Sequence, residues 1–179
     1  MRKTSEQGVE LIKRFEGLRL TAYKVTGANE KYYTIGYGHY GKDVTPDMRI
    51  TEEQATELLR QDLARFEQHV NSYDDIYKWT QPEFDAMVSF AYNIGSIDLL
   101  TQYGKRTKYE ISFYMTRYVN AGGKKLDGLV SRRQAERVVF LTPEREELVG
   151  ELHTMLGTIN YTKGANNEQE ERTNRESIE

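Results

Sequence analysis

The fold class is decided by the stretch Tyr32-Tyr33-Thr34-Ile35-Gly36-Tyr37-Gly38-His39, which interrupts an otherwise helical chain. Aromatic and β-branched residues favour strands, and closely spaced glycines mark tight turns. The same mixture of tyrosine and glycine extends through residues 20–45. The sequence therefore predicts a small antiparallel sheet in this region.

Helical patterns lie on both sides of the predicted sheet. Ser5 can cap a short helix that ends near Gly17. Two capping boxes, which begin at Thr51 and at Thr80, each open a further helix. We expect the first of these helices to be long and amphipathic and to reach about residue 71, and the second to end at Gly95.

Three more helices are expected downstream. They cover residues 107–119, residues 128–141 and the segment from Thr142-Pro143 to Gly157. The helix over residues 128–141 is predicted to turn Leu129, Arg133, Val138 and Leu141 inward. The fold class is thus α+β, with a small N-terminal β-hairpin lobe and a mainly helical lobe.

The composition excludes several classes of protein. The 179 residues include no cysteine, so disulfides, thiolate metal sites and a cysteine nucleophile are excluded. A net charge of −3 argues against a nucleic-acid binder. No apolar run approaches the length of a membrane span, and the basic N-terminus lacks the apolar run of a signal peptide. No metal or other cofactor is expected.

Charge and polarity divide the chain. Residues 158–179 are polar and are predicted to form a disordered tail or linker behind a folded domain over residues 1–157. Residues 43–75 hold nine acids and three bases, whereas residues 105–140 hold nine bases and three acids. The basic segment could face an anionic partner or could consist of solvated helix faces, and both interpretations stay open.

Glu16 is the first candidate for chemistry. It ends the first predicted helix, and Phe15 and Leu18 flank it with apolar surface. A carboxyl group in such surroundings loses hydration, which favours the protonated form that a general acid needs. The alternative is an ordinary solvated glutamate at a helix end.

Other candidates lie in the sheet region. Thr34 is followed by glycines that would let a ligand approach the backbone closely. The thirteen tyrosines combine a flat apolar face with one hydroxyl, which suits a sugar ring but also suits ordinary packing. His39 is expected to be a structural hydrogen-bond partner, for example of Asp85.

Several motifs in order resemble the tailed-phage lysozymes, or endolysins, of glycoside hydrolase family 24. The resemblance covers roughly residues 8–142 and rests on the segments Phe15-Glu16-Gly17-Leu18-Arg19-Leu20, Thr34-Ile35-Gly36-Tyr37-Gly38-His39, Phe84-Asp85-Ala86-Met87-Val88-Ser89-Phe90-Ala91-Tyr92-Asn93-Ile94-Gly95, Asn120-Ala121-Gly122-Gly123-Lys124 and Gly128-Leu129-Val130-Ser131-Arg132-Arg133-Gln134-Ala135-Glu136. It implies a lysozyme fold with a substrate cleft between the two lobes.

The resemblance also implies an activity. It is hydrolysis of the β-1,4 bond between N-acetylmuramic acid and N-acetylglucosamine in bacterial peptidoglycan. Glu16 would be the general acid and Thr34 would place the attacking water. Tyr32, Tyr37 and Asn93 are predicted to contact the substrate. The resemblance further implies a monomer that stays in the host cytoplasm until a holin releases it to the cell wall.

One position departs from the family's pattern. The family carries an aspartate, or in some members a cysteine, between the glutamate and the threonine, and here that position falls on Val25. Glycosidases generally use two carboxylates. Glu30 could replace the aspartate, Asp43 could fill the role, or Glu16 and Thr34 could suffice. A threonine that holds a water suits inversion of the sugar's configuration, but the sequence gives no distance that decides it.

Two other functions stay open. The valine at position 25 would suit a non-catalytic peptidoglycan-binding module. A lytic transglycosylase also begins from one catalytic glutamate. The sequence does not tell the host species, nor whether a wall-binding domain follows the tail.

Overall fold

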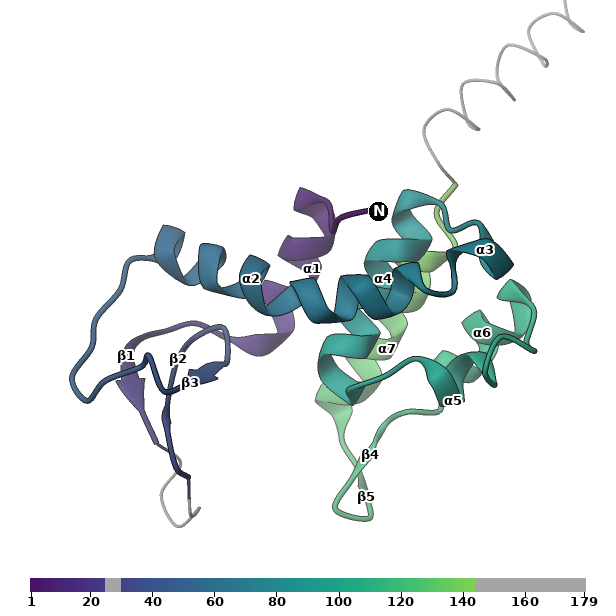
Figure 1. Ribbon diagram of the computed structural model, residues 1–179. Coiled ribbons are helices and arrows are strands. Elements are labelled where there is room, and N and C mark those ends of the chain that lie inside the picture. Colours follow the sequence, from purple (N-terminus) through teal and green to yellow (C-terminus); the bar gives the residue numbers. More distant parts are fainter. Residues whose placement is uncertain (25–29, 144–179) are drawn as a thin grey trace, which may run out of the picture. The chain divides into compact units, whose positions relative to one another are not determined.

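The computed structural model describes residues 1–24 and 30–143 of the chain (Figure 1). Helices and a small antiparallel sheet share this part, so the predicted α+β class is confirmed. The helix expected to run on to Gly157 and the polar segment 158–179 lie outside the described residues. The elements are α1 (Glu6–Glu16), β1 (Arg19–Tyr23), β2 (Tyr33–Gly36), β3 (His39–Gly41), α2 (Glu52–Asn71), α3 (Asp74–Tyr77), α4 (Gln81–Ile94), α5 (Asp98–Thr101), α6 (Lys108–Met115), β4 (Asn120–Ala121), β5 (Lys124–Lys125) and α7 (Asp127–Phe140).

Local capping defines most helix ends as predicted. The Ser5 hydroxyl accepts a hydrogen bond from the backbone N–H of Gly8 at 3.2 Å, and Gly17 caps the C-terminal end of α1. Thr51 and Thr80 close the two capping boxes, at the starts of α2 and α4. Gly95 ends α4 in the left-handed region, at a φ of 98°, where glycine has no steric penalty.

The sheet lies where the tyrosine- and glycine-rich segment predicted it. Its strand order is β1-β2-β3, all antiparallel, with Thr34 opposite Tyr40 and Ile35 opposite His39. Helix α2 packs so closely on β2 that a Cβ at Gly36 would lie 3.2 Å from the Cβ of Ala55. The long helix α2 therefore contacts both the sheet and the helices of the core.

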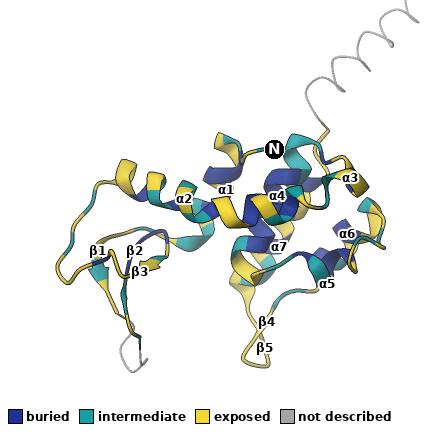
Figure 2. Cartoon of the chain, viewed as in Figure 1, coloured by how far each residue is buried: buried dark blue, intermediate teal, exposed yellow. Residues whose placement is uncertain are grey.

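The core centres on α4. Every residue from Phe84 to Ala91 is buried, and α4 packs against α1, α2 and α7 (Figure 2). Trp79 precedes this helix, is 1% exposed and stacks on Tyr77 at a ring distance of 4.4 Å. None of the helices in the described segments is long and apolar enough to cross a bilayer.

Two details of the predicted helices are wrong. The helix expected over residues 107–119, α6, ends at Met115. Val138 on α7 and Leu141 just after it are 68% and 51% exposed, although the pattern predicts both inward. Three charged residues take the inward positions together with Phe140, because they pair with one another in an ionic network. They are Arg132, Arg133 and Glu136.

Candidate active site

A cavity of about 650 Å³ opens at the C-terminal end of α1. Its lining comes from four parts of the chain that lie far apart in sequence: the end of α1, the segment from Gly38 to Tyr40, one face of α2 and the last turn of α4. The lining residues are Glu16, Gly38, Tyr40, Gln61, Asp62, Ala64, Arg65 and Tyr92. Glu16 is thus the one predicted site residue that lines this cavity.

Glu16 does not lie among apolar side chains alone, as its neighbours in sequence suggested. Its carboxylate accepts a hydrogen bond from Nη1 of Arg132 at 2.5 Å, and its side chain is 22% exposed. The Arg132 side chain is only 4% exposed. A buried guanidinium therefore stands directly against the candidate general acid, and it can stabilise the carboxylate that remains when the acid gives up its proton.

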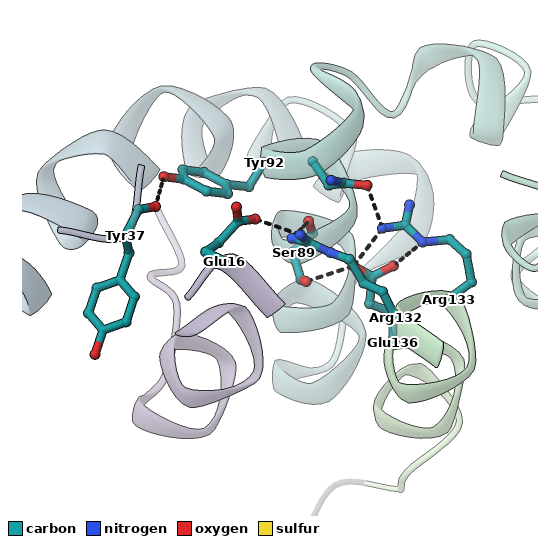
Figure 3. Close-up of polar contacts among 8 residues, drawn as sticks. Glu16, Tyr37, Ser89, Tyr92, Arg132, Arg133 and Glu136 are labelled. Carbon is teal, nitrogen blue, oxygen red and sulfur yellow. Dashed lines mark hydrogen bonds and ion pairs between the residues drawn. The ribbon is translucent and has the colours of Figure 1, made fainter. Parts of the chain in front are cut away.

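Arg132 belongs to a buried ionic network on α4 and α7 (Figure 3). Its Nε donates to Glu136 at 3.1 Å and its Nη2 donates to the carbonyl of Ser89 at 3.1 Å. The Ser89 hydroxyl also donates to Glu136, at 2.7 Å. Arg133 donates from Nη2 to Glu136 and to the side-chain carbonyl of Asn93, both at 3.0 Å.

Burial changes the acid–base properties of this network. Desolvation raises the pKa of the Glu136 carboxyl, whereas Arg133 and Arg132 oppose that rise. Desolvation also lowers the pKa of Arg133 to about 10, against the pull of Glu136. Asn93, which is predicted to bind the substrate, is exposed and accepts from Arg133. It is therefore connected to Glu16 through the charged residues of α7.

Tyr92 connects α4 to the segment that follows β2. Its hydroxyl donates to the backbone carbonyl of Tyr37 at 3.1 Å, beside Glu16 (Figure 3). Burial is the main cause that raises the pKa of Tyr92 well above its ordinary value, so the phenol stays neutral. Tyr37 itself is 4% exposed and donates its hydroxyl to Glu52. The Tyr37 ring therefore lies in the core, and its contact with the substrate stays a prediction.

The remaining predicted site residues lie outside the cavity lining. Thr34 is buried on the central strand β2. Tyr32 is half-buried and packs edge-to-face on Tyr40, with the ring centroids 5.6 Å apart. Glu30 is half-buried, and its backbone carbonyl accepts from Nζ of Lys24 at 2.9 Å. Val25 lies outside the described residues.

His39 has other partners than the expected Asp85. Its ring nitrogens lie 2.9 Å from Asp62 and 2.9 Å from Asp43, so it joins β3 to α2. Asp85 is instead held by Ser5, which caps the start of α1, and by Gln81, the first residue of α4. Burial disfavours a charged imidazole, but the two carboxylates outweigh it and raise the pKa of His39 above its ordinary value.

Sequence reasoning missed the cavity residues contributed by α2 and α4, Arg132 and the role of Glu136. One signal was present, since Arg132, Arg133 and Glu136 share a helical spacing in which an inward-facing arginine needs a nearby acid. Within the described ranges, no group of three His, Cys, Asp or Glu residues is placed to hold a metal ion.

A small sheet, a helical body and a glutamate that enters a cavity from the end of the first helix define a lysozyme-like protein. Comparison with known sequences agrees, since the family model described as phage lysozyme matches residues 13–136. The chain belongs to the phage lysozyme family.

Known relatives and structures share this region. The chain is 46% identical to the endolysin of Bacillus phage B103 over 151 residues. This aligned region covers 80% of this chain and 56% of that protein. It is 33% identical to the endolysin of Salmonella phage P22, over 79% of this chain and 100% of that protein. The chain spans only 54–61% of the length of its Bacillus and Lactococcus phage relatives.

The fold is similar to that of two solved proteins. A mutant of P22 lysozyme superposes with a TM-score of 0.64, at 34% identity, over 79% of this chain and 100% of the other. The muramidase domain of SpmX from Asticaccaulis excentricus gives a TM-score of 0.66, at 35% identity, over 80% of this chain and 100% of the other.

Proposed function

We propose that this domain is a peptidoglycan hydrolase that cleaves the β-1,4 bond between N-acetylmuramic acid and N-acetylglucosamine. The observation that carries the proposal is the position of Glu16, which lines the cavity and contacts a buried arginine. The similar proteins, which include endolysins and a muramidase domain, support the same activity.

In the proposed reaction the protonated Glu16 carboxyl gives its proton to the glycosidic oxygen. The bond between that oxygen and the sugar's anomeric carbon then breaks, and positive charge develops on the sugar ring. Arg132 stabilises the carboxylate left on Glu16, at the hydrogen bond that joins them. Water attacks the anomeric carbon from the opposite face, and its proton passes to a second base.

Glu16→Gln is the decisive test, because glutamine keeps the shape of the side chain but cannot give a proton. We expect release of reducing sugar from purified peptidoglycan to fall by about 10²-fold or more. The matched control is Glu10→Gln on the exposed side of the same helix, where the glutamate pairs with Lys13. Unchanged hydrolysis by a folded Glu16→Gln protein would contradict the mechanism.

The base that activates the water is proposed to be Glu30, with Thr34 holding the water. Glu30→Gln is then expected to cost about 10²-fold in hydrolysis while circular dichroism stays unchanged. Asp43→Asn is the comparison, since Asp43 is the other carboxylate considered for this role. Hydrolysis by Glu30→Gln at the original rate would remove Glu30, and a loss confined to Asp43→Asn would assign the role to Asp43.

Product analysis separates the remaining alternatives. A hydrolase leaves reducing ends, whereas a lytic transglycosylase leaves 1,6-anhydro-muramic ends that mass spectrometry identifies. A binding module would retain wall binding and release no sugar. We further propose that the protein acts as a monomer and reaches the wall from the host cytoplasm after release by a holin.

A further inference from the structure

Arg132 stands between two carboxylates. Its Nη1 donates to Glu16 at 2.5 Å and its Nε donates to Glu136 at 3.1 Å (Figure 3). The third guanidinium nitrogen, Nη2, donates to the Ser89 carbonyl. With every nitrogen engaged, this guanidinium has a fixed position, and its single positive charge is shared by two acids.

The contacts of Glu136 fit its ionised form. Its Oε1 accepts from Ser89, Arg132 and Arg133 at 2.7, 3.1 and 3.0 Å, and its Oε2 lies 2.9 Å from Nε of Arg133. Three donors thus converge on Oε1, whereas Oε2 meets Arg133 as an ion pair and has no hydrogen-bond partner among the described residues. A proton on Oε1 would point at these three donors, and the positive charges of Arg132 and Arg133 favour the carboxylate.

Stability alone gives a weak reason for this arrangement. The side chains of Arg133 and Glu136 are 0% exposed, and burying charges carries a large desolvation cost. Apolar residues of similar volume often stabilise a core as well as a buried ion pair does. Nη1 of Arg133 also has no hydrogen-bond partner among the described residues. The feature that distinguishes this network is its contact with Glu16.

We propose that Glu136 is a positioning residue that sets the charge state of Glu16 by sharing Arg132. The inference rests on the proposed role of Glu16 as general acid. Arg132 places a positive charge directly against Glu16, whereas a general acid must carry a proton. The negative charge of Glu136 lies on the other side of Arg132 and offsets that positive charge.

Other charged or titratable groups face Glu16 and stay unchanged in the variants below. They are Tyr92 from α4, Asp62 and Arg65 from α2 and Tyr40 from β3, all of which line the same cavity. Asp62 is engaged by His39. A difference between variants of α7 therefore reports the network itself.

The network makes two predictions of opposite sign. Glu136→Gln removes the offsetting negative charge, so the basic limb of the pH profile of kcat/KM should move down by about one pH unit. Arg133→Gln removes the positive charge of Arg133, which partly neutralises Glu136. The basic limb of the pH profile should then move to higher pH by a similar amount. The double variant, which loses both charges, should return it close to the original pH.

The same shifts should appear without catalysis. NMR titration of ¹³C-labelled glutamate follows the Glu16 carboxyl directly, and its midpoint should move down in Glu136→Gln and up in Arg133→Gln. Arg137→Gln is the matched control, because this exposed arginine lies on α7 outside the network. Its midpoint should stay unchanged.

The outcomes separate this inference from the proposed function. Shifts of the same sign in both single variants, or a uniform loss of rate with no shift, would overturn the role of Glu136. If Glu136→Gln does not fold, Arg133→Gln and the double variant decide by their own shifts. An inactive but folded wild-type protein would refute the proposed function, while the NMR midpoints would still test the coupling.

Discussion

His39 joins β3 to α2 because its two ring nitrogens face Asp62 and Asp43. These contacts raise the pKa of His39, so folding takes up a proton at this residue when the pH is near neutral. The stabilising contribution is therefore complete below the unfolded pKa of about 6.5 and is lost as the pH rises through the higher folded value.

We expect His39→Gln to lower the free energy of unfolding by about 1 kcal/mol at pH 5.5, where the charged imidazole pairs with two carboxylates. The loss is no larger because Asp43 is largely exposed and screened by solvent. The loss should be smaller at pH 9, where the wild-type imidazole is neutral. Urea denaturation at both pH values measures the difference. An equal loss at both would show that the contacts act through packing and not through charge.

At the scale of elements, α1 and α4 meet where no side chain fits. A Cβ at Gly8 would lie 2.7 Å from both Asp85 and Thr4. A Cβ at Gly128, in the first turn of α7, would have no atom within 4 Å, so this glycine offers a matched comparison. Both glycines are helical, so replacement by alanine should favour the helix by up to about 1 kcal/mol where space permits.

We expect the two alanine variants to change stability in opposite directions. Gly8→Ala should destabilise the protein by about 1–3 kcal/mol, since overpacking at Asp85 exceeds the gain in helix propensity. Gly128→Ala should be neutral or stabilising by a few tenths to about 1 kcal/mol. Thermal unfolding of both proteins tests this, and a stabilised Gly8→Ala would show that α1 can move away from α4.

At the scale of the whole molecule, the basic segment 105–140 does not present all of its positive charge at the surface. Arg132 and Arg133, two of the nine bases in residues 105–140, are buried in the site, and Lys108 pairs with Glu83 at 2.6 Å. Lys124 and Lys125 are exposed on the β4–β5 hairpin. An anionic wall would therefore meet a smaller positive charge than the sequence suggests.

Neutralising this hairpin should weaken action on intact walls. We expect Lys124→Gln with Lys125→Gln to lower the rate on purified walls several-fold at about 10 mM salt and to have little effect above about 0.15 M, where the Debye length is about 8 Å. Lys42→Gln, an exposed lysine just after β3, is the control. Equal losses at both salt concentrations would indicate that the hairpin lysines act by another means.

Local chemistry made much of the fold predictable. The caps at Ser5, Thr51 and Thr80 are hydrogen bonds within three residues, so the sequence alone determines where α1, α2 and α4 begin. The sheet follows from the tyrosines and glycines around Ile35, and the family follows from several motifs in order. Glu16 could be singled out because it ends a helix.

The partners of these residues were decided by tertiary structure. Glu16 and Arg132 are 116 residues apart, His39 contacts Asp62 in place of Asp85, and the Tyr37 ring lies in the core. Periodicity placed Val138 inward, whereas Glu136 occupies the buried face because Ser89 and two arginines compensate its charge. Such contacts depend on how helices pack side by side, and no spacing within one element encodes that packing.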